Sequence, residues 1–259
     1  ERTDVHAPRK VWLAMVTKAA NSGKIADLVP NAEDLRAKKI LDDFDRNRKG
    51  LKEKVAAIVT NRKAAIDRNQ AAIIAAEPLI KPADRVDFAT FTTTIKGQLD
   101  NFQTEADAIT DYEELKAKVL ELKYLGVNNV YLPAQKQYLG AAASYPRLAV
   151  LAQVNDLLIA RATARPNTVA ERDLLVAEAN ALDTRLTAAE TALGAALTGP
   201  LQDALTTRGN ATADSVVLAL AALDTARNDL RAAGSEINAI RGAVGRLFGQ
   251  IKAAEASTR

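Results

Sequence analysis

The stretch SVVLALAALDTARNDLRAAGSEINAIRGAVGRLFGQIKAA, residues 215–254, decides the fold. It keeps apolar residues at positions a and d of six consecutive heptads. Position a, at 216, 223, 230, 237, 244 and 251, holds Val, Leu, Leu, Ile, Val and Ile. Position d, at 219, 226, 233, 240, 247 and 254, holds Ala, Ala, Ala, Ile, Leu and Ala. An apolar seam of this length predicts one long helix in a coiled coil or helical bundle.

Three glycines lie near the end of this helix, at Gly242, Gly245 and Gly249. In the heptad frame Gly242 and Gly249 occupy position f and Gly245 position b, on the side opposite the seam. Each lowers helix stability by roughly 1 kcal/mol relative to alanine. Either these glycines form a smooth interaction face for close approach of another helix, or the packed seam tolerates a weakened helix end. The residues alone leave both open.

The first half of the chain shows similar periodicity, interrupted by proline. Asn31 is placed to cap a long helix that ends at Glu77, before Pro78. Its apolar residues form a row with a seven-residue repeat and a flanking row: Phe44, Leu51, Ile58 and Ala65, then Val59, Ile66 and Ile73. Arg62 and Asn69 on this helix either lie in the packed seam and set its register or face water.

The remaining elements are shorter, apart from one second long helix. KPAD (81–84) begins a helix that can continue to Gly126, and its short connection predicts an antiparallel hairpin with the preceding helix. GVNNVYLP (126–133) is typical of a turn. Further helices are expected at 8–22, where Trp12 would pack on the bundle, and at 134–144, 146–164, 168–196 and 201–208.

Two of these helices carry informative apolar patterns. The helix at 146–164 is apolar on more than one face, so we place it in the centre of the bundle. The helix at 168–196 opens with a capping box, Thr168 followed by Glu171. Its expected seam is Leu175, Ala179, Leu182, Leu186, Ala189, Leu193 and Ala196.

Composition supports helices and restricts the chemistry. The 259 residues are 48% hydrophobic but only 4% aromatic, because most of the apolar residues are Ala, Leu, Val and Ile. The chain has no cysteine and a single histidine, His6, so thiolate chemistry and Cys-ligated metals are excluded. The predicted fold class is all-α, an elongated antiparallel helical bundle with long coiled-coil-like helices. We expect an N-terminal short helix and linker (1–30), a long hairpin (31–126), bridging helices (127–167) and a C-terminal hairpin (168–259), forming one continuous bundle.

Charge and hydropathy bear on partners and compartment. Residues 1–70 carry 16 Lys and Arg against 10 Asp and Glu, which gives +6, and the remaining residues carry 19 against 22, which gives −3. RNRKGLKEK (46–54) is the densest basic run, but it lacks the aromatic residues and overall basic bias typical of nucleic-acid binding, which we do not expect. We find no transmembrane segment or signal peptide, and expect a cytoplasmic or bacterially secreted protein.

One acidic cluster resembles a metal motif. DDFDR (42–46) brings Asp42, Asp43 and Asp45 together and resembles the Asp-rich motif of the all-α Mg²⁺-dependent terpenoid synthases, but Arg46 replaces its last Asp. NDLRAAGSE (228–236) resembles that family's second motif and lacks its hydroxyl ligand. We interpret the cluster as a solvated helix face.

These patterns predict a non-catalytic structural or protein–protein interaction module, a helical scaffold or spacer from a larger bacterial protein. It would use its helical faces to bind a protein partner or a second copy. We expect no cofactor, metal or small-molecule substrate. The alternative is a helical region of a secreted bacterial toxin, effector or translocator that changes conformation or contacts membranes. A third reading is the all-α Mg²⁺ enzyme.

Overall fold

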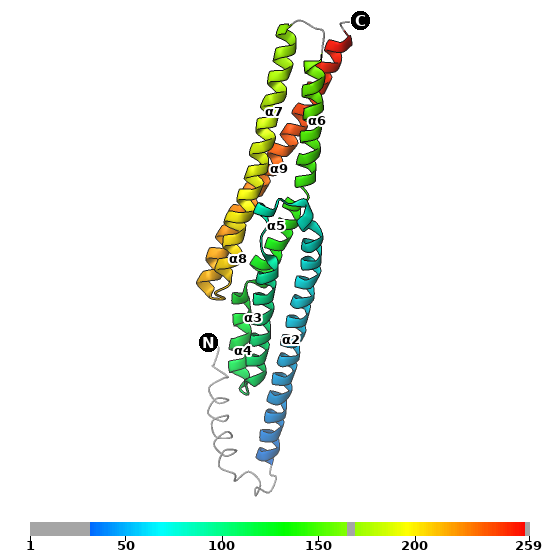
Figure 1. Cartoon of the computed structure of the whole chain (residues 1–259). Helices are drawn as coiled ribbons and strands as arrows, with labels where there is room; N and C mark the ends of the chain where they lie inside the picture. The colour runs from blue at the N-terminus through cyan, green and yellow to red at the C-terminus, as the bar shows by residue number, and fades with distance from the viewer. Residues whose placement is uncertain (1–31, 165–168, 257–259) are drawn as a thin grey trace, which may run out of the picture.

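The computed structural model describes residues 32–164 and 169–256, without the side chains of 32–41 and 44. These residues form helices and turns without a strand, so the predicted all-α bundle is confirmed (Figure 1). The expected helix at 8–22 with Trp12, His6 and the Thr168 cap lie outside the described residues. The long and medium helices are α2 (Ala32–Ala76), α3 (Phe88–Ala108), α4 (Tyr112–Glu121), α5 (Leu132–Ala142), α6 (Tyr145–Thr163), α7 (Val169–Ala196), α8 (Gln202–Arg208) and α9 (Ala213–Ala256). Short helical turns connect them: η2 (Glu77–Leu79), η3 (Pro82–Asp84), η4 (Leu122–Leu125), η5 (Val127–Tyr131) and η6 (Leu197–Leu201).

The lower half of the molecule is a three-helix bundle. Helix α3 returns antiparallel along α2, and Lys96 Nζ donates to Asp67 Oδ1 at 2.8 Å between them. Helices α4 and α5 then run parallel to α2 as the third member, and Asn69 Nδ2 donates to Gln135 Oε1 at 3.1 Å across that contact. Figure 1 shows this half as the blue, cyan and green helices below the junction.

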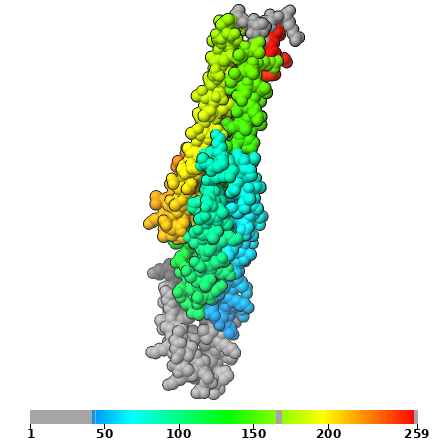
Figure 2. All heavy atoms as spheres, viewed as in Figure 1, coloured from blue at the N-terminus to red at the C-terminus, as the bar shows by residue number. Residues whose placement is uncertain are grey.

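The upper half is a second three-helix bundle, formed by α6, α7 and α9. Helix α7 is antiparallel to α9, with Arg185 Nε donating to Glu236 Oε1 at 2.8 Å. Helix α6 is parallel to α9, with Arg161 Nε donating to Glu255 Oε1 at 2.6 Å. Figure 2 shows the elongated outline, with α6 and α7 side by side in the upper half.

The two seams predicted for the C-terminal helices are confirmed. Eleven of the twelve a and d positions of α9 are buried, and the twelfth, Leu230, is half-buried against the same core. All seven expected seam residues of α7 are buried as well. The periodicity alone therefore located the faces on which these helices pack.

The packed row of α2 differs from the predicted one. The buried residues are Val55, Val59, Ile66 and Ile73, whereas Ile58, placed in the central row, is 37% exposed. The flanking row is the true centre, and it is the row that α2 buries in its contacts with α3, α4 and α5. Arg62 and Asn69 lie between these residues and are half-buried, so they belong to the packed side of the helix.

Helix α3 is shorter at both ends than predicted. KPAD forms a single turn of 3₁₀ helix, and α3 begins only at Phe88, where the Asp87 side chain accepts from the backbone N–H of Thr90 at 3.0 Å. The helix does not continue to Gly126. The backbone turns extended at Ile109, and Asp111 caps α4 by accepting from the backbone N–H of Glu114 at 2.8 Å.

The segment 126–133, expected to be a turn, continues the helical path with a local distortion. Gly126 is left-handed, with φ of 61°, and a π-helical turn follows from Val127 to Tyr131. Val127, Val130 and Tyr131 are buried. Helices α4, α5 and α6 consequently form one ascending, kinked spine that passes from the lower bundle into the upper one (Figure 1).

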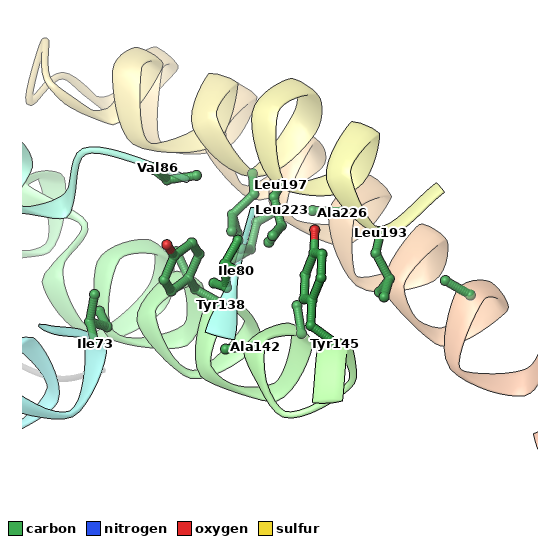
Figure 3. Close-up of a cluster of buried hydrophobic side chains, with 14 of the residues drawn as sticks. Ile73, Ile80, Val86, Tyr138, Ala142, Tyr145, Leu193, Leu197, Leu223 and Ala226 are labelled. Carbon is green, nitrogen blue, oxygen red and sulfur yellow. The ribbon is translucent and has the colours of Figure 1, made fainter. Parts of the chain in front are cut away.

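The two bundles meet around a shared apolar cluster. Figure 3 shows Tyr138 and Tyr145 of the spine among side chains from α2, α7, α9 and the connecting turns. Its labelled members are Ile73, Ile80, Val86, Tyr138, Ala142, Tyr145, Leu193, Leu197, Leu223 and Ala226. They belong to a hydrophobic core that extends through both bundles. The junction is thus packed like the interior of either half.

Candidate functional site

A buried arginine lies where the end of α8 meets α3 and the turn that precedes α5. Arg208, the last residue of α8, is only 1% exposed. Its Nη1 donates to the carbonyl oxygen of Leu125 at 2.8 Å and its Nη2 to Gln98 Oε1 at 3.1 Å. Gln98 Nε2 donates in turn to the Gly209 carbonyl at 2.7 Å. This one side chain therefore connects the end of α8 to α3 and to the spine.

The guanidinium of Arg208 has no carboxylate partner among the described residues. Its nearest electrostatic support is the ring of Tyr131, 5.7 Å from the Arg208 Cζ atom. Burial lowers the pKa of Arg208 to about 10, against a small opposing effect of Tyr131. Carbonyl and amide oxygens replace water around this charge, as expected for an unpaired buried cation.

Gly126 makes room for that arginine. A Cβ at Gly126 would lie 2.8 Å from Arg208 Cγ, and the positive φ disfavours any other residue at this position. The left-handed turn of the spine and the buried side chain of α8 are therefore mutually dependent.

Further polar contacts tie α2 and α3 to the spine. Thr92 Oγ1 donates to Gln70 Oε1 at 2.8 Å and lies 2.6 Å from the hydroxyl of Tyr131. Arg62 Nη1 donates to the Leu122 carbonyl at 3.4 Å, and burial lowers the pKa of Arg62. These side chains fix the register of the lower bundle against the spine, the first of the two alternatives that the sequence left open for Arg62.

A second polar contact lies at the junction, between Tyr145 and Asp84. The hydroxyl of Tyr145 donates to Asp84 Oδ2 at 2.9 Å. Burial raises the pKa of Tyr145, and the Asp84 carboxylate raises it further. A Cβ at Gly194 of α7 would lie 2.4 Å from Asp84 Oδ1, so this carboxylate contacts the α7 backbone.

The acidic cluster of α2 pairs within its own helix. Asp43 pairs with Arg46 at 3.4 Å and Asp45 with Arg48 at 2.9 Å, while Asp42 is exposed. Within residues 32–164 and 169–256 no group of three or more His, Cys, Asp or Glu side chains could hold a metal ion. In the second resembling motif, Asn228 and Asp229 are exposed and Glu236 pairs with Arg185 of α7. The fold thus gives Asp43, Asp45 and Glu236 ion-pair partners on helix surfaces.

The basic run 46–54 has a local structural role. Arg48 Nη1 donates to the Thr110 carbonyl at 2.6 Å, and Lys52 Nζ donates to the Asp107 carbonyl. Both carbonyls lie at the C-terminal end of α3, where backbone oxygens have no partner within the helix. Arg48 and Lys52 therefore cap the C-terminal end of α3.

The three glycines of the predicted interaction face are exposed on α9, away from its buried seam. A Cβ at Gly245 or Gly249 would meet no atom within 4 Å, and one at Gly242 would meet only Arg246 Nη1, at 3.6 Å. Packing inside the chain therefore does not require glycine at any of them.

We compared the chain with known protein families, curated proteins and solved structures. No protein family, curated protein or solved structure matches this chain.

The exposed apolar face of α6 was not predicted from the sequence. Helix α6 is not central in the bundle, because Val150 is 57% exposed and Leu157 is 69% exposed. The sequence signal of this surface is the apolar content of the helix on more than one face, and the prediction of a central helix is wrong. The structure covers one of these faces with α7 and α9 and leaves the other open.

Proposed function

We propose that the chain is a non-catalytic helical spacer and scaffold that holds an interaction surface at a fixed distance from its lower end. The observation that carries this proposal is the junction, where a kinked but continuous spine crosses between two three-helix bundles and a shared core surrounds it. Buried Arg208 adds long-range hydrogen bonds at the same place. A linker between two independent domains would have exposed and sparsely packed residues there.

The helices are long enough for such a role. Helix α9 has 44 residues and α2 has 45, so each spans about 65 Å at 1.5 Å per residue. The two overlap only at the junction, which makes the molecule longer than either helix (Figure 1). A rod of this kind suits the connecting part of a larger bacterial protein.

Small-angle X-ray scattering of the purified chain tests this proposal. A compact domain of 259 residues would have a radius of gyration of about 18 Å. The rod should give a value of roughly 25 Å or more, because two helices of about 65 Å that overlap only in part make a rod of roughly 90 Å or longer, and the radius of gyration of a thin rod is its length divided by the square root of twelve. A compact particle would contradict the spacer function.

The competing function is a helical region of a secreted toxin, effector or translocator that contacts membranes. The exposed apolar side chains of α9, Val217, Leu218 and Phe248, are the observation that favours it. No described helix is both long and apolar enough to cross a bilayer. Liposome flotation at neutral and acidic pH separates the two functions: the spacer stays unbound at both, whereas binding with leakage at either pH would support the competing function.

A further inference from the structure

An apolar stripe on the upper bundle has no covering element. On α6, Val150 and Leu157 are exposed and Val154 between them is half-buried, so the three form one stripe at helical spacing. On the neighbouring α9, Phe248 is 45% exposed beside this stripe, 5.8 Å from Arg161 Cζ. Side chains of this size on adjacent turns form a continuous apolar surface, which is characteristic of a binding site.

The stripe borders two hollows that follow one another along α9 and together are called the groove. Its lower part lies between α9 and α5, and its upper part, of about 520 Å³, between α9 and the first turns of α6. The two parts share α9, from Arg227 to Arg241. The apolar residues along the groove are Ala141, Leu151, Leu193, Leu230 and Ile237.

The rim of this groove is positively charged. Four arginines line it, Arg147 on α6 and Arg227, Arg231 and Arg241 on α9, and no Asp or Glu lines either part. Of these four arginines, only Arg227 has an ion-pair partner among the described residues, Asp224 at 2.8 Å. Three cations therefore remain available beside an apolar surface.

Small residues let another backbone approach the groove closely. Gly140 lines its lower part, and Gly245 lies one turn beyond Arg241 on the same side of α9. A Cβ at either glycine would meet nothing within 4 Å. No part of the described chain fills the space beside Gly140 and Gly245.

We propose that this groove binds an acidic amphipathic α-helix of a partner protein, which lies along α9 as the fourth helix of the upper bundle. Its apolar face covers Val150, Leu157 and Phe248, and its carboxylates pair with the arginines of the rim. The 22 residues from Arg227 to Phe248 correspond to about 33 Å, the length of a helix of about six turns. The inference rests on the proposed scaffold function and names the partner of its interaction surface.

Charge favours an acidic partner helix over the chain's own N-terminal segment as the occupant of the groove. The expected helix at 8–22 carries Arg9, Lys10 and Lys18 and no acidic residue, so the arginines of the rim would repel it. A second copy of the chain is the remaining occupant, and the experiment below distinguishes it.

The test is selection from a displayed library of 22-residue helices with a fixed apolar stripe and Glu, Lys, Gln or Ala at each flanking position. The intact chain should enrich helices with Glu beside the stripe. Leu157→Glu should weaken binding of an enriched helix at least about tenfold, because it places a charge in the apolar contact. The matched control is Leu174→Glu on α7, which is 73% exposed but lies outside the groove and should bind as the wild type does.

The charge preference has its own test. The double variant Arg147→Glu and Arg241→Glu should lose binding to the Glu-rich helix and bind the corresponding Lys-rich helix. Enrichment without charge preference, enrichment of Lys-rich helices, insensitivity to Leu157→Glu or no enrichment at all would each overturn the proposal. So would sedimentation of the wild type as a dimer that Leu157→Glu dissociates, since the occupant would then be a second copy.

The two experiments distinguish a wrong assignment of the groove from a wrong scaffold function. A chain that scatters as a rod but selects no acidic helix keeps the spacer function and loses the groove assignment. A compact particle in scattering removes the spacer function whatever the library selects.

Discussion

Replacing Gly242, Gly245 and Gly249 together by alanine should stabilise the protein. All three are exposed within α9, on the side opposite its buried seam. The added methyl groups meet no atom within 4 Å at two of the positions, and at Gly242 the nearest atom is Arg246 Nη1 at 3.6 Å, an ordinary contact distance. The substitutions therefore change helix propensity without changing packing.

The size of the effect follows from that geometry. Alanine is better than glycine in an exposed helix interior by about 0.8–1.0 kcal/mol per residue. The three substitutions should raise the free energy of unfolding by about 2–3 kcal/mol, and the melting temperature of a chain of this length by about 5–10 °C.

Urea unfolding followed by circular dichroism measures this change, with an unchanged dependence on urea concentration showing that the same surface unfolds. Amide hydrogen exchange should slow between residues 240 and 254 in the triple variant. The matched control is Gly126→Ala, which should destabilise the protein by at least about 1–2 kcal/mol because its φ is 61° and its Cβ would press on Arg208. A triple variant no more stable than the wild type would refute the reasoning and show that the glycines serve a packing role within the chain.

Three further predictions concern the core and the junction. Ile66→Ala should lower the free energy of unfolding by about 2–5 kcal/mol, and Ile58→Ala by less than about 1 kcal/mol, because only Ile66 is fully buried; equal losses in urea unfolding would contradict the register of α2. Asn155→Leu should stabilise the protein by about 1 kcal/mol, because the Asn155 Oδ1 atom is buried without a partner; a loss of stability would show that its bond to α7 dominates. Stability should also fall as the pH rises above about 10, because the folded-state pKa of Tyr145 is raised by burial and the folded protein keeps a proton that the unfolded chain has lost. Tyr145→Phe should reduce that slope in urea titrations at pH 9 and 11, and an unchanged slope would remove Tyr145 as its source.

Sequence periodicity predicted the buried faces of α7 and α9. In α7 and α9 the apolar residues repeat without interruption, so the buried face follows directly from the pattern. In α2, Ile58 and Val59 are adjacent and both apolar, so two rows of apolar residues run side by side. The pattern does not decide between the row of Ile58 and the row of Val59, and the prediction of the Ile58 row as the centre is wrong.

The junction and the groove depend on contacts that local sequence does not contain. Gln98 and Arg208 are 110 residues apart, and nothing near either one indicates that they meet. The break before α4 had a local signal in Asp111, a residue suited to N-capping, which the apolar periodicity around it obscured. For α6, apolar residues on more than one face are compatible with an exposed apolar surface as well as with a central helix, and only the arrangement of α7 and α9 decides between them.

The claim that the junction is rigid can be measured directly by double electron–electron resonance. The chain has no cysteine, so Ala117→Cys on α4 and Ala160→Cys on α6 introduce the sole labelling sites, both at exposed positions on opposite sides of the junction. A rigid spine should give one narrow distance distribution, at or below the about 65 Å that 43 helical residues would span in a straight line. A broad distribution, or two separate distances, would show that the two bundles move independently and would contradict the spacer function.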